Sequence, residues 1–434
     1  MCFIAGGEFG DREGHTLIIV KALYGLKSSG LRWHQRFSKV LRDMGFIPSR
    51  AERDIWMRDC GDHYEHIATY VDDLIIGSKD PEAIVNTLTS PKYGFKLKGT
   101  GDVSYHLGSD YFRDKHGYLC FAPRKYVINM VETYQRLFGQ APKEYTSPLE
   151  KGDHPELDDS EFLSLEDTKK YQSMIGALQW VIQIGRLDIT TACMTMSSFR
   201  AQPRKGHLDR LKRIYGYLSK MRHAAIRVRT ELPDLSDLPN VERDWSQTVY
   251  AGAEEEIPKD APRPLGKPVI HTLYYDANLY HDMLSGKAVT AVIHFLNKTP
   301  VDWFSKKQAT VETATYGSEF VAGRTATDQT VDIRLSLRYL GVPILGSSIG
   351  FGDNKSQVDS SSIPDGRLHR RHTMLAYHRV REASAAGIIQ FYHVEGAINA
   401  ADILSKHRGY QQVWPQLQPL LFWEGDTLDI PPRP

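Results

Sequence analysis

The order of apolar segments after residue 268 constrains the fold of this chain more than any other feature. Three strand-like segments come first: PVIHTLYYDAN, AVTAVIHFLN and PVDWFS. They are followed by a long helical pattern over 312–340, a fourth strand SSIGFGDN, a shorter helix over 368–386 and a fifth strand IIQFYHV, after which NAADILSKH opens a last helix. Strands that alternate with helices in this way predict an α/β domain with a mixed sheet.

The first 230 residues predict a different, α+β arrangement. Strand-like runs at 17–27 and 64–78 enclose a helical pattern that begins near Ser28, and a further β-rich stretch ends near residue 122. Helical patterns dominate 124–138 and 168–220. Residues 231–260 hold nine acidic residues and a proline-rich stretch follows, so we interpret 231–267 as an acidic linker.

The composition excludes several classes of protein. Hydrophobic residues make up 41% of the 434 residues and charged residues 25%, which excludes a largely disordered chain. A net charge of +1 excludes a uniformly basic surface and leaves a locally basic face open. The four cysteines are scattered without a CxxC pair, which argues against a zinc knuckle or a disulfide scaffold. No apolar run approaches the ~20 residues of a membrane span, and no signal peptide is visible.

Two adjacent aspartates form the first candidate metal site. Asp72 and Asp73 lie in the segment YVDD, between two apolar strand-like runs. Neighbouring carboxylates at the tip of a hairpin repel each other, and a divalent cation such as Mg²⁺ removes that conflict. The alternative is an ordinary turn, because aspartate is common in turns.

A second set of acids is spread over the predicted α/β domain. Its four members lie at strand ends and helix starts: Asp276, Glu319, Asp353 and Asp402. Such positions can converge on one edge of a sheet, where four carboxylates could hold two divalent ions across a phosphodiester. Each acid taken alone is better explained as a helix cap or a surface group, so the combination carries the hypothesis.

The chain then resembles a known family, motif by motif. In the first half KALYGLKSSGLRWHQRF (21–37), YVDD (70–73), YHLG (105–108), PRKY (123–126), YQSMIGALQW (171–180), GRLDIT (185–190) and PRKGHLDRLKRIYGYL (203–218) resemble the reverse transcriptase of copia-type retrotransposons. In the second half YYDAN (274–278), DWFSKKQ (302–308), YGSEF (316–320), GDNK (352–355) and ADILSK (401–406) resemble the ribonuclease H domain that follows it in those polyproteins. The motifs occur in the family's order and cover nearly the whole chain.

The resemblance implies a multidomain α/β and α+β fold. Its parts are a partial polymerase palm at 1–100, a thumb/connection-like region at 101–230, the linker at 231–267, a ribonuclease H-like mixed-sheet domain at 268–409 and a tail at 410–434. Asp72 and Asp73 match the paired aspartates of the polymerase metal site. The acids of the α/β domain match the catalytic ligands of two Mg²⁺ ions that hydrolyse the RNA strand of RNA–DNA hybrids.

Two departures from the family stand out. Family polymerases use another catalytic aspartate in an earlier motif, and only 20 residues precede Lys21 here, so we expect a truncated polymerase half without activity. Many ribonucleases H use a histidine shortly before the last aspartate. His393 lies nine residues before Asp402, but its surroundings align poorly, and a packed or solvated imidazole is the alternative. Two other functions stay open: a full RNA-directed DNA polymerase within a longer polyprotein, or a non-catalytic nucleic-acid-binding remnant.

Basic residues are the candidate contacts to nucleic acid. They come from the motif at 21–37, the basic run 200–229 and a basic helix before the fifth strand: Lys21, Lys27, Arg204, Lys205, Arg210, Lys212, Arg213, Arg370 and Arg371. The alternative for each helix is a solvated basic face. The expected partners are an RNA–DNA hybrid, a template–primer and other polyprotein segments, with no membrane. The family implies a cytoplasmic location in virus-like particles, with access to the nucleus.

Overall fold

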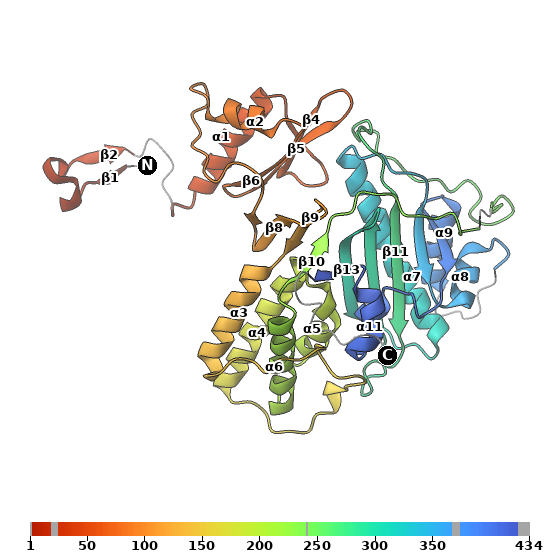
Figure 1. The fold of residues 1–434 in the computed structure, drawn as a ribbon. Coiled ribbons are helices and arrows are strands. Elements are labelled where there is room, and N and C mark those ends of the chain that lie inside the picture. The colour runs from red at the N-terminus through yellow and green to blue at the C-terminus, as the bar shows by residue number, and fades with distance from the viewer. Residues whose placement is uncertain (1, 19–24, 240–241, 367–373, 424–434) are drawn as a thin grey trace. The chain divides into compact units, whose positions relative to one another are not determined.

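The computed structural model describes residues 2–18, 25–239, 242–366 and 374–423, which form two compact units (Figure 1). Unit 1 comprises 1–102, 261–266 and 336–342, and unit 2 comprises the remaining residues. Lys21, Arg370 and Arg371 lie outside the described residues. In the part of the chain that the structure describes, no helix has the length and apolar character to span a membrane.

Unit 1 is built on a four-stranded antiparallel sheet with the order β3-β4-β5-β6. Its strands are β3 (Ile47–Pro48), β4 (Ile55–Asp59), β5 (Tyr64–Tyr70) and β6 (Asp73–Gly77). Helices α1 (Ser29–Asp43) and α2 (Pro81–Thr89) pack on it through a shared core that includes Leu41, Trp56 and Leu88. A separate ribbon joins β1 (Cys2–Ile4) to β2 (Thr16–Ile18), with a 3₁₀ helix η1 (Gly7–Arg12) between them. The predicted helix after Ser28 and the hairpin at 64–78 are confirmed.

The larger sheet of unit 2 is the predicted mixed sheet, in the order β13-β12-β11-β14-β15 (Figure 1). The strands are β11 (His271–Asn278), β12 (Val289–Leu296), β13 (Thr299–Lys307), β14 (Ser348–Gly352) and β15 (Ile389–His393). The first three are antiparallel, whereas β14 runs parallel to β11 and to β15. Helices α7 (Thr315–Tyr339), α8 (Lys355–Ser362) and α9 (Met374–Ala385) contribute to the core on one face of this sheet.

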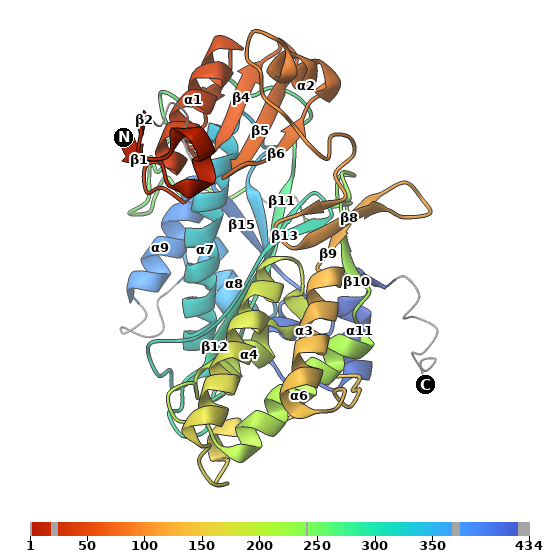
Figure 2. The same ribbon diagram turned by 90° about the vertical axis from the view of Figure 1, so that its left-hand side faces the viewer.

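The rest of unit 2 combines a helical group with a second sheet (Figure 2). The helices are α3 (Arg124–Phe138), α4 (Leu165–Gln183), α5 (Thr190–Ser197) and α6 (Lys205–Lys220), with 3₁₀ turns η2 (Pro155–Leu157) and η3 (Leu187–Ile189). The second sheet has the order β16-β10-β9-β8-β7, from β7 (Tyr105–His106), β8 (Ser109–Arg113), β9 (Leu119–Ala122), β10 (Ala224–Arg227) and β16 (Phe422–Trp423). Because β16 pairs with β10, Phe422 and Trp423 join the edge of this second sheet.

Strand β12 is buried on both faces, which explains its nearly continuous apolar sequence. Ala291 and Ile293 belong to the core that includes residues of α3–α6, α10 (Asp402–Ser405) and the chain after α11 (Tyr410–Leu417). Val292 belongs to the opposite core, with residues of α7, α8 and α9. Because side chains alternate along a strand, one strand joins both cores. The segment interpreted as thumb/connection thus shares a hydrophobic core with the mixed-sheet segment.

The GRLDIT motif has a structural role in that shared core. Arg186 is fully buried and pairs with Asp188 through two hydrogen bonds of 2.9 and 2.7 Å. Tyr217 donates a third hydrogen bond to Asp188 at 2.7 Å, and Arg186 also donates to the Met221 carbonyl. Since buried charges are tolerated only when they are paired and hydrogen-bonded, this arrangement fixes η3 against α6.

Two elements differ from the sequence expectation. Helix α8 was not predicted, because KSQVDSSS has no apolar periodicity; Asn354 caps it by accepting a hydrogen bond from Gln357 N. The last predicted helix is a single turn, α10, and a separate helix α11 follows it. The described residues of 231–267 contain no helix or strand, yet Glu255 forms an ion pair of 2.7 Å with Arg334 of α7.

Candidate active site

Parallel pairing brings two of the predicted acids to one edge of the mixed sheet. Asp276 lies near the end of β11, and Asp353 follows directly after β14. These strands are parallel neighbours, with Tyr274 opposite Phe351, so their carboxyl ends emerge together. Helix α10 begins at Asp402, and Glu319 lies in the second turn of α7.

Three of the four acids form one cluster. Carboxylate oxygens of Asp276, Asp353 and Asp402 all lie within 4.8 Å of one another. Asp276 is 1% exposed, Glu319 2% and Asp402 0%. Glu319 is outside the group of three, but its buried Oε2 has no hydrogen-bond partner. The structure therefore brings three of the acids together and leaves the buried Oε2 of Glu319 without a hydrogen-bond partner, as the hypothesis of a shared cation site requires.

The electrostatics of the cluster show uncompensated negative charge. Burial, together with the charges of Asp276 and Asp353, raises the pKa of Glu319 well above its ordinary value. Burial and the charge of Asp276 also raise the pKa of Asp353. The pKa of Asp402 is raised by the same two causes, although Lys406 and Arg408 oppose them. The charge of Asp276 therefore makes ionisation of Glu319, Asp353 and Asp402 costly, which a divalent cation would reverse.

Residues of the chain itself compensate one side of the cluster. Lys406 Nζ lies 3.1 Å from Asp276 Oδ2 and also forms a short ion pair with Asp402 Oδ1. Arg408 Nη2 lies 2.6 Å from Asp402 Oδ2, and Ser405 Oγ donates a short hydrogen bond to Asp276. Burial acts to lower the pKa of Lys406, but the charges of Asp276 and Asp402 outweigh it, so the pKa is raised and the ammonium stays charged.

Buried polar contacts hold the acids in place. Asn399 is fully buried and donates a hydrogen bond of 3.0 Å to the Tyr275 carbonyl, while its Oδ1 accepts from Ala401 N. This ties the chain before α10 to the residue that precedes Asp276. A Cβ at Gly352 would lie 2.5 Å from the Tyr275 ring, so glycine is required immediately before Asp353.

His393 contacts the cluster through the backbone. Its Nε2 lies 3.1 Å from the Asp353 carbonyl oxygen. A carbonyl only accepts, so Nε2 carries the hydrogen and donates it. The imidazole is therefore placed to orient Asp353.

The other candidate metal pair, Asp72 and Asp73, lies at the β5–β6 turn of unit 1. Tyr70 pairs with Asp73, so Val71 and Asp72 form a two-residue connection. Val71 has φ +57°, a left-handed conformation that is costly for a β-branched residue. Both aspartates are exposed, and among the described residues they belong to no group of three or more ligands.

The candidate nucleic-acid contacts of α6 form intramolecular ion pairs. Arg210 binds Asp153 at 2.9 Å and Asp158 at 2.6 Å, and Arg213 binds Glu150 at 2.9 Å. The remaining three engage nearby groups in the same region: Lys205 with Glu161, Lys212 with Asp209, and Arg204 with the Ser160 carbonyl. Lys27 is exposed in a turn of unit 1. Binding of phosphate by the arginines would have to compete with these pairs.

The residues that surround the acids were missed by the sequence reasoning. All four lie within nine residues of one another: Ser405 and Lys406 end the motif ADILSK, Asn399 precedes it and Arg408 follows it. The signal available in the sequence was a lysine four residues after Asp402, the spacing of an ion pair on a helix. The contacts to Asp276, 129 residues away in the chain for Ser405, come from the tertiary fold.

Comparison with known proteins supports the resemblance. Residues 4–145 match the family of reverse transcriptases (RNA-dependent DNA polymerases). The retrovirus-related Pol polyprotein from transposon RE1 of Arabidopsis thaliana is 25% identical over 91% of this chain and 24% of its own length. The corresponding polyprotein from transposon TNT 1-94 of Nicotiana tabacum is 22% identical over 92% of this chain and 28% of its own length. The chain thus spans about a quarter of the length of these relatives.

Solved structures of low similarity cover part of the chain. A ribonuclease H1 from the archaeon Halobacterium salinarum is 15% identical, with a TM-score of 0.25, over 32% of this chain and 95% of its own. A foamy viral protease–reverse transcriptase in complex with an RNA/DNA hybrid is 14% identical, with a TM-score of 0.23, over 56% of this chain and 32% of its own. The chain is thus similar to a segment of retrotransposon Pol polyproteins, and its residues 4–145 match the reverse transcriptase family.

Proposed function

We propose that this retrotransposon-related chain hydrolyses the RNA strand of RNA–DNA hybrids at the acid cluster of unit 2. The observation that carries the proposal is the buried cluster of Asp276, Asp353 and Asp402, with the unsatisfied oxygen of Glu319 beside it. Concentrating this much negative charge in a buried place is costly and has no structural benefit of its own. It is expected where a site must bind cations.

The donor set fits Mg²⁺. All four candidate ligands are carboxylates, which are the oxygen donors that this ion prefers, and no sulfur or imidazole donor belongs to the cluster. When bound, Mg²⁺ supplies activation of a water molecule and stabilisation of the leaving oxygen of a phosphodiester. Asp276, Glu319, Asp353 and Asp402 would hold the ions in a two-metal arrangement.

The chain's own groups keep the acids in position for this chemistry. Ser405 orients the Asp276 carboxylate by its hydrogen bond, and Asn399 fixes the chain that leads into Asp402. His393 donates to the backbone of Asp353. Such positioning groups reduce the reorganisation that a reaction would otherwise require.

The substrate class follows from the reverse transcriptase region on the same chain. RNA-directed DNA synthesis produces an RNA–DNA hybrid, and a nuclease joined to that activity meets this hybrid first. We include in the proposal that polymerase activity is lost from the chain taken alone, and that the protein works with template–primer and other polyprotein segments. The proposed location is cytoplasmic virus-like particles, with access to the nucleus.

The test is cleavage of a labelled RNA–DNA hybrid by the full chain with Mg²⁺. Asp353→Asn should lower the cleavage rate by at least about a hundredfold, because it removes one negative ligand from the cluster. The control is Asp332→Asn, on the exposed side of α7, which should cleave at the wild-type rate. Equal cleavage by the Asp353→Asn protein and the wild type would refute the assignment.

A further inference from the structure

The acid cluster is compensated unevenly by the chain's own cations. Lys406 Nζ lies 3.1 and 3.3 Å from the two oxygens of Asp276 and contacts Asp402 as well. Arg408 binds the second oxygen of Asp402 at 2.6 Å. No ion pair to Glu319 or Asp353 occurs among the described residues, and Oε2 of Glu319 is unsatisfied. The ammonium thus lies between two acids, and the other two have no such partner.

The position of Lys406 resembles that of a bound cation. Its ammonium is shared between carboxylates on two different elements, Asp276 of β11 and Asp402 of α10. Its side chain is 26% exposed, whereas those of Asp276 and Asp402 are 1% and 0% exposed. The lysine therefore reaches the buried acids from a partly open side.

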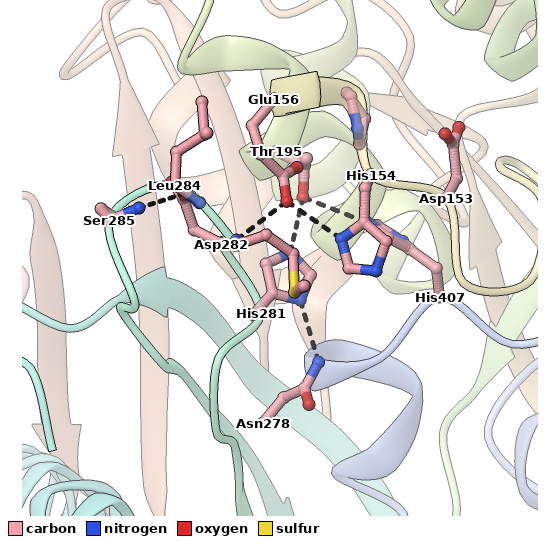
Figure 3. Close-up of polar contacts among 12 residues, drawn as sticks. Asp153, His154, Glu156, Thr195, Asn278, His281, Asp282, Leu284, Ser285 and His407 are labelled. Atoms are coloured by element: carbon pink, nitrogen blue, oxygen red, sulfur yellow. Dashed lines mark hydrogen bonds and ion pairs between the residues drawn. The ribbon is translucent and has the colours of Figure 1, made fainter. Parts of the chain in front are cut away.

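The backbone next to Lys406 belongs to a hydrogen-bonded network, of which Figure 3 shows Asn278, His281, Thr195 and His407. The Asn278 amide donates to Ser405 O at 3.2 Å and to His281 Nδ1 at 3.0 Å. His281 Nδ1 therefore accepts, so its Nε2 carries the hydrogen and donates to Thr195 Oγ1 at 3.2 Å. Thr195 Oγ1 also lies within hydrogen-bond distance of His407 Nε2, at 3.3 Å. This network places the chain on both sides of Lys406.

We propose that Lys406 is an intrinsic counter-ion of the cluster, which holds Asp276 and Asp402 together in the metal-free protein and competes with divalent cations for them. It is a positioning residue, and this inference rests on the proposed function only in taking the cluster as a cation site. Competition of this kind sets the concentration of divalent ion at which the site fills. Arg408, which forms an ion pair with Asp402, keeps that acid oriented when the lysine is displaced.

The experiment compares full-length wild type with Lys406→Met and the control Lys298→Met, which alters an exposed lysine in the β12–β13 turn. Mn²⁺ is the probe, with binding followed by its electron paramagnetic resonance signal. Lys406→Met should bind Mn²⁺ about tenfold more tightly, since a competing ion pair of about 1.4 kcal/mol is removed. The same variant without Mn²⁺ should melt at a lower temperature, because two buried carboxylates lose their counter-ion.

Competition predicts opposite changes in Lys406→Met: a higher affinity for Mn²⁺ and a lower stability of the metal-free protein. An ordinary structural role of Lys406 predicts that both the affinity and the stability fall. Lys406→Arg keeps the charge and should restore the metal-free melting temperature. Weaker or unchanged Mn²⁺ binding by Lys406→Met would overturn the proposal. Absence of Mn²⁺ binding in every variant would overturn both this proposal and the proposed function. Binding that tightens as expected, without hybrid cleavage by wild type, would overturn the proposed function alone.

Discussion

At the scale of single residues, the acids of the cluster lie at one edge of the mixed sheet, and Lys406 forms ion pairs with two of them, Asp276 and Asp402. Asp276, Glu319, Asp353 and Asp402 lie at strand ends and helix starts, positions that can be recognised from the pattern of apolar residues. Ser405 and Lys406 carry no such pattern, since their roles depend on distances across the sheet. The sequence therefore predicts where charge is concentrated, while the neutralisation of that charge depends on packing.

Glu319 shows most directly what it costs to concentrate negative charge in a buried site. Its Oε2 is buried without a hydrogen-bond partner, and burial with the charges of Asp276 and Asp353 raises its pKa. Glu319→Gln removes the charge and keeps the shape of the side chain. We therefore expect the free energy of unfolding of the metal-free protein to rise by about 1 kcal/mol, which raises its melting temperature by a few degrees. Hybrid cleavage with Mg²⁺ should be lost in the same variant.

Melting curves of the full chain in the presence of a chelator measure this effect. Gln357→Glu is the reverse comparison, because it would add a charge at a fully buried position near Tyr275. This variant should lower the melting temperature. A lower melting temperature for Glu319→Gln would show that the carboxylate stabilises the metal-free fold, contrary to this account.

At the scale of elements, the strands and long helices followed from apolar periodicity, whereas short elements did not. Helix α8 lacks periodicity and depends on the Asn354 cap and on Gln357, which is fully buried. The two strands at 64–78 were predicted correctly. The positive φ of Val71 could not be predicted, because valine rarely adopts a positive φ and its residue type gives no indication of one. Strain of this kind at a turn next to Asp72 is typical of functional positions.

The histidine network that joins β11, α5 and the chain after α10 gives a pH dependence. Burial lowers the pKa of His281 to about 4 and that of His407 to about 3. Charged and titratable groups that face His281 are Glu156, Lys307, His154 and Asp282. Because the folded state keeps these imidazoles neutral while the unfolded chain takes up a proton near pH 6.5, stability is present above that pH and is lost as the pH falls toward 4.

The free energy of unfolding should therefore fall by about 2 kcal/mol for His281 alone between about pH 7 and about pH 5. His281→Gln retains an acceptor and a donor but cannot titrate, so its stability should depend less on pH over the same range. Urea unfolding of the full chain, followed by circular dichroism at each pH, measures the difference. His116→Gln, at the exposed β8–β9 turn, should leave the pH dependence unchanged. An equal pH dependence in His281→Gln and wild type would contradict the assignment of His281.

At the scale of the whole molecule, the α/β order after residue 268 predicted the mixed sheet correctly, because parallel and antiparallel neighbours follow from the connections between strands. The hydrophobic core that the helical group shares with the mixed sheet could not be predicted from the sequence. Tyr217 of α6 and Ile293 of β12 belong to one cluster, although an acidic segment separates them in the chain. Burial on both faces of β12 could be inferred from its apolar sequence. Which elements of the chain cover the second face could not be inferred.

Whether the chain alone extends a primer depends on which acids the whole fold brings together, and we expect no extension. Nucleotide addition needs metal ions held by carboxylates from more than one strand. Asp72 and Asp73 are exposed on one hairpin, and within the described residues no third acid joins them, whereas the cluster of unit 2 gathers three within 4.8 Å. Asp11, the aspartate that precedes Lys21, is exposed in η1.

Primer extension on a poly-A template and hybrid cleavage, run in the same Mg²⁺ buffer with the full chain, test this contrast between the two acid sites. Cleavage should be present and extension absent, because each 1.36 kcal/mol of missing transition-state stabilisation lowers the rate about tenfold. Asp72→Asn should then leave cleavage unchanged, since Asp72 belongs to unit 1 and the cluster to unit 2. Extension by the wild type that Asp72→Asn abolishes would show that the hairpin completes a polymerase site, and the proposed division of activity between the two units would be wrong.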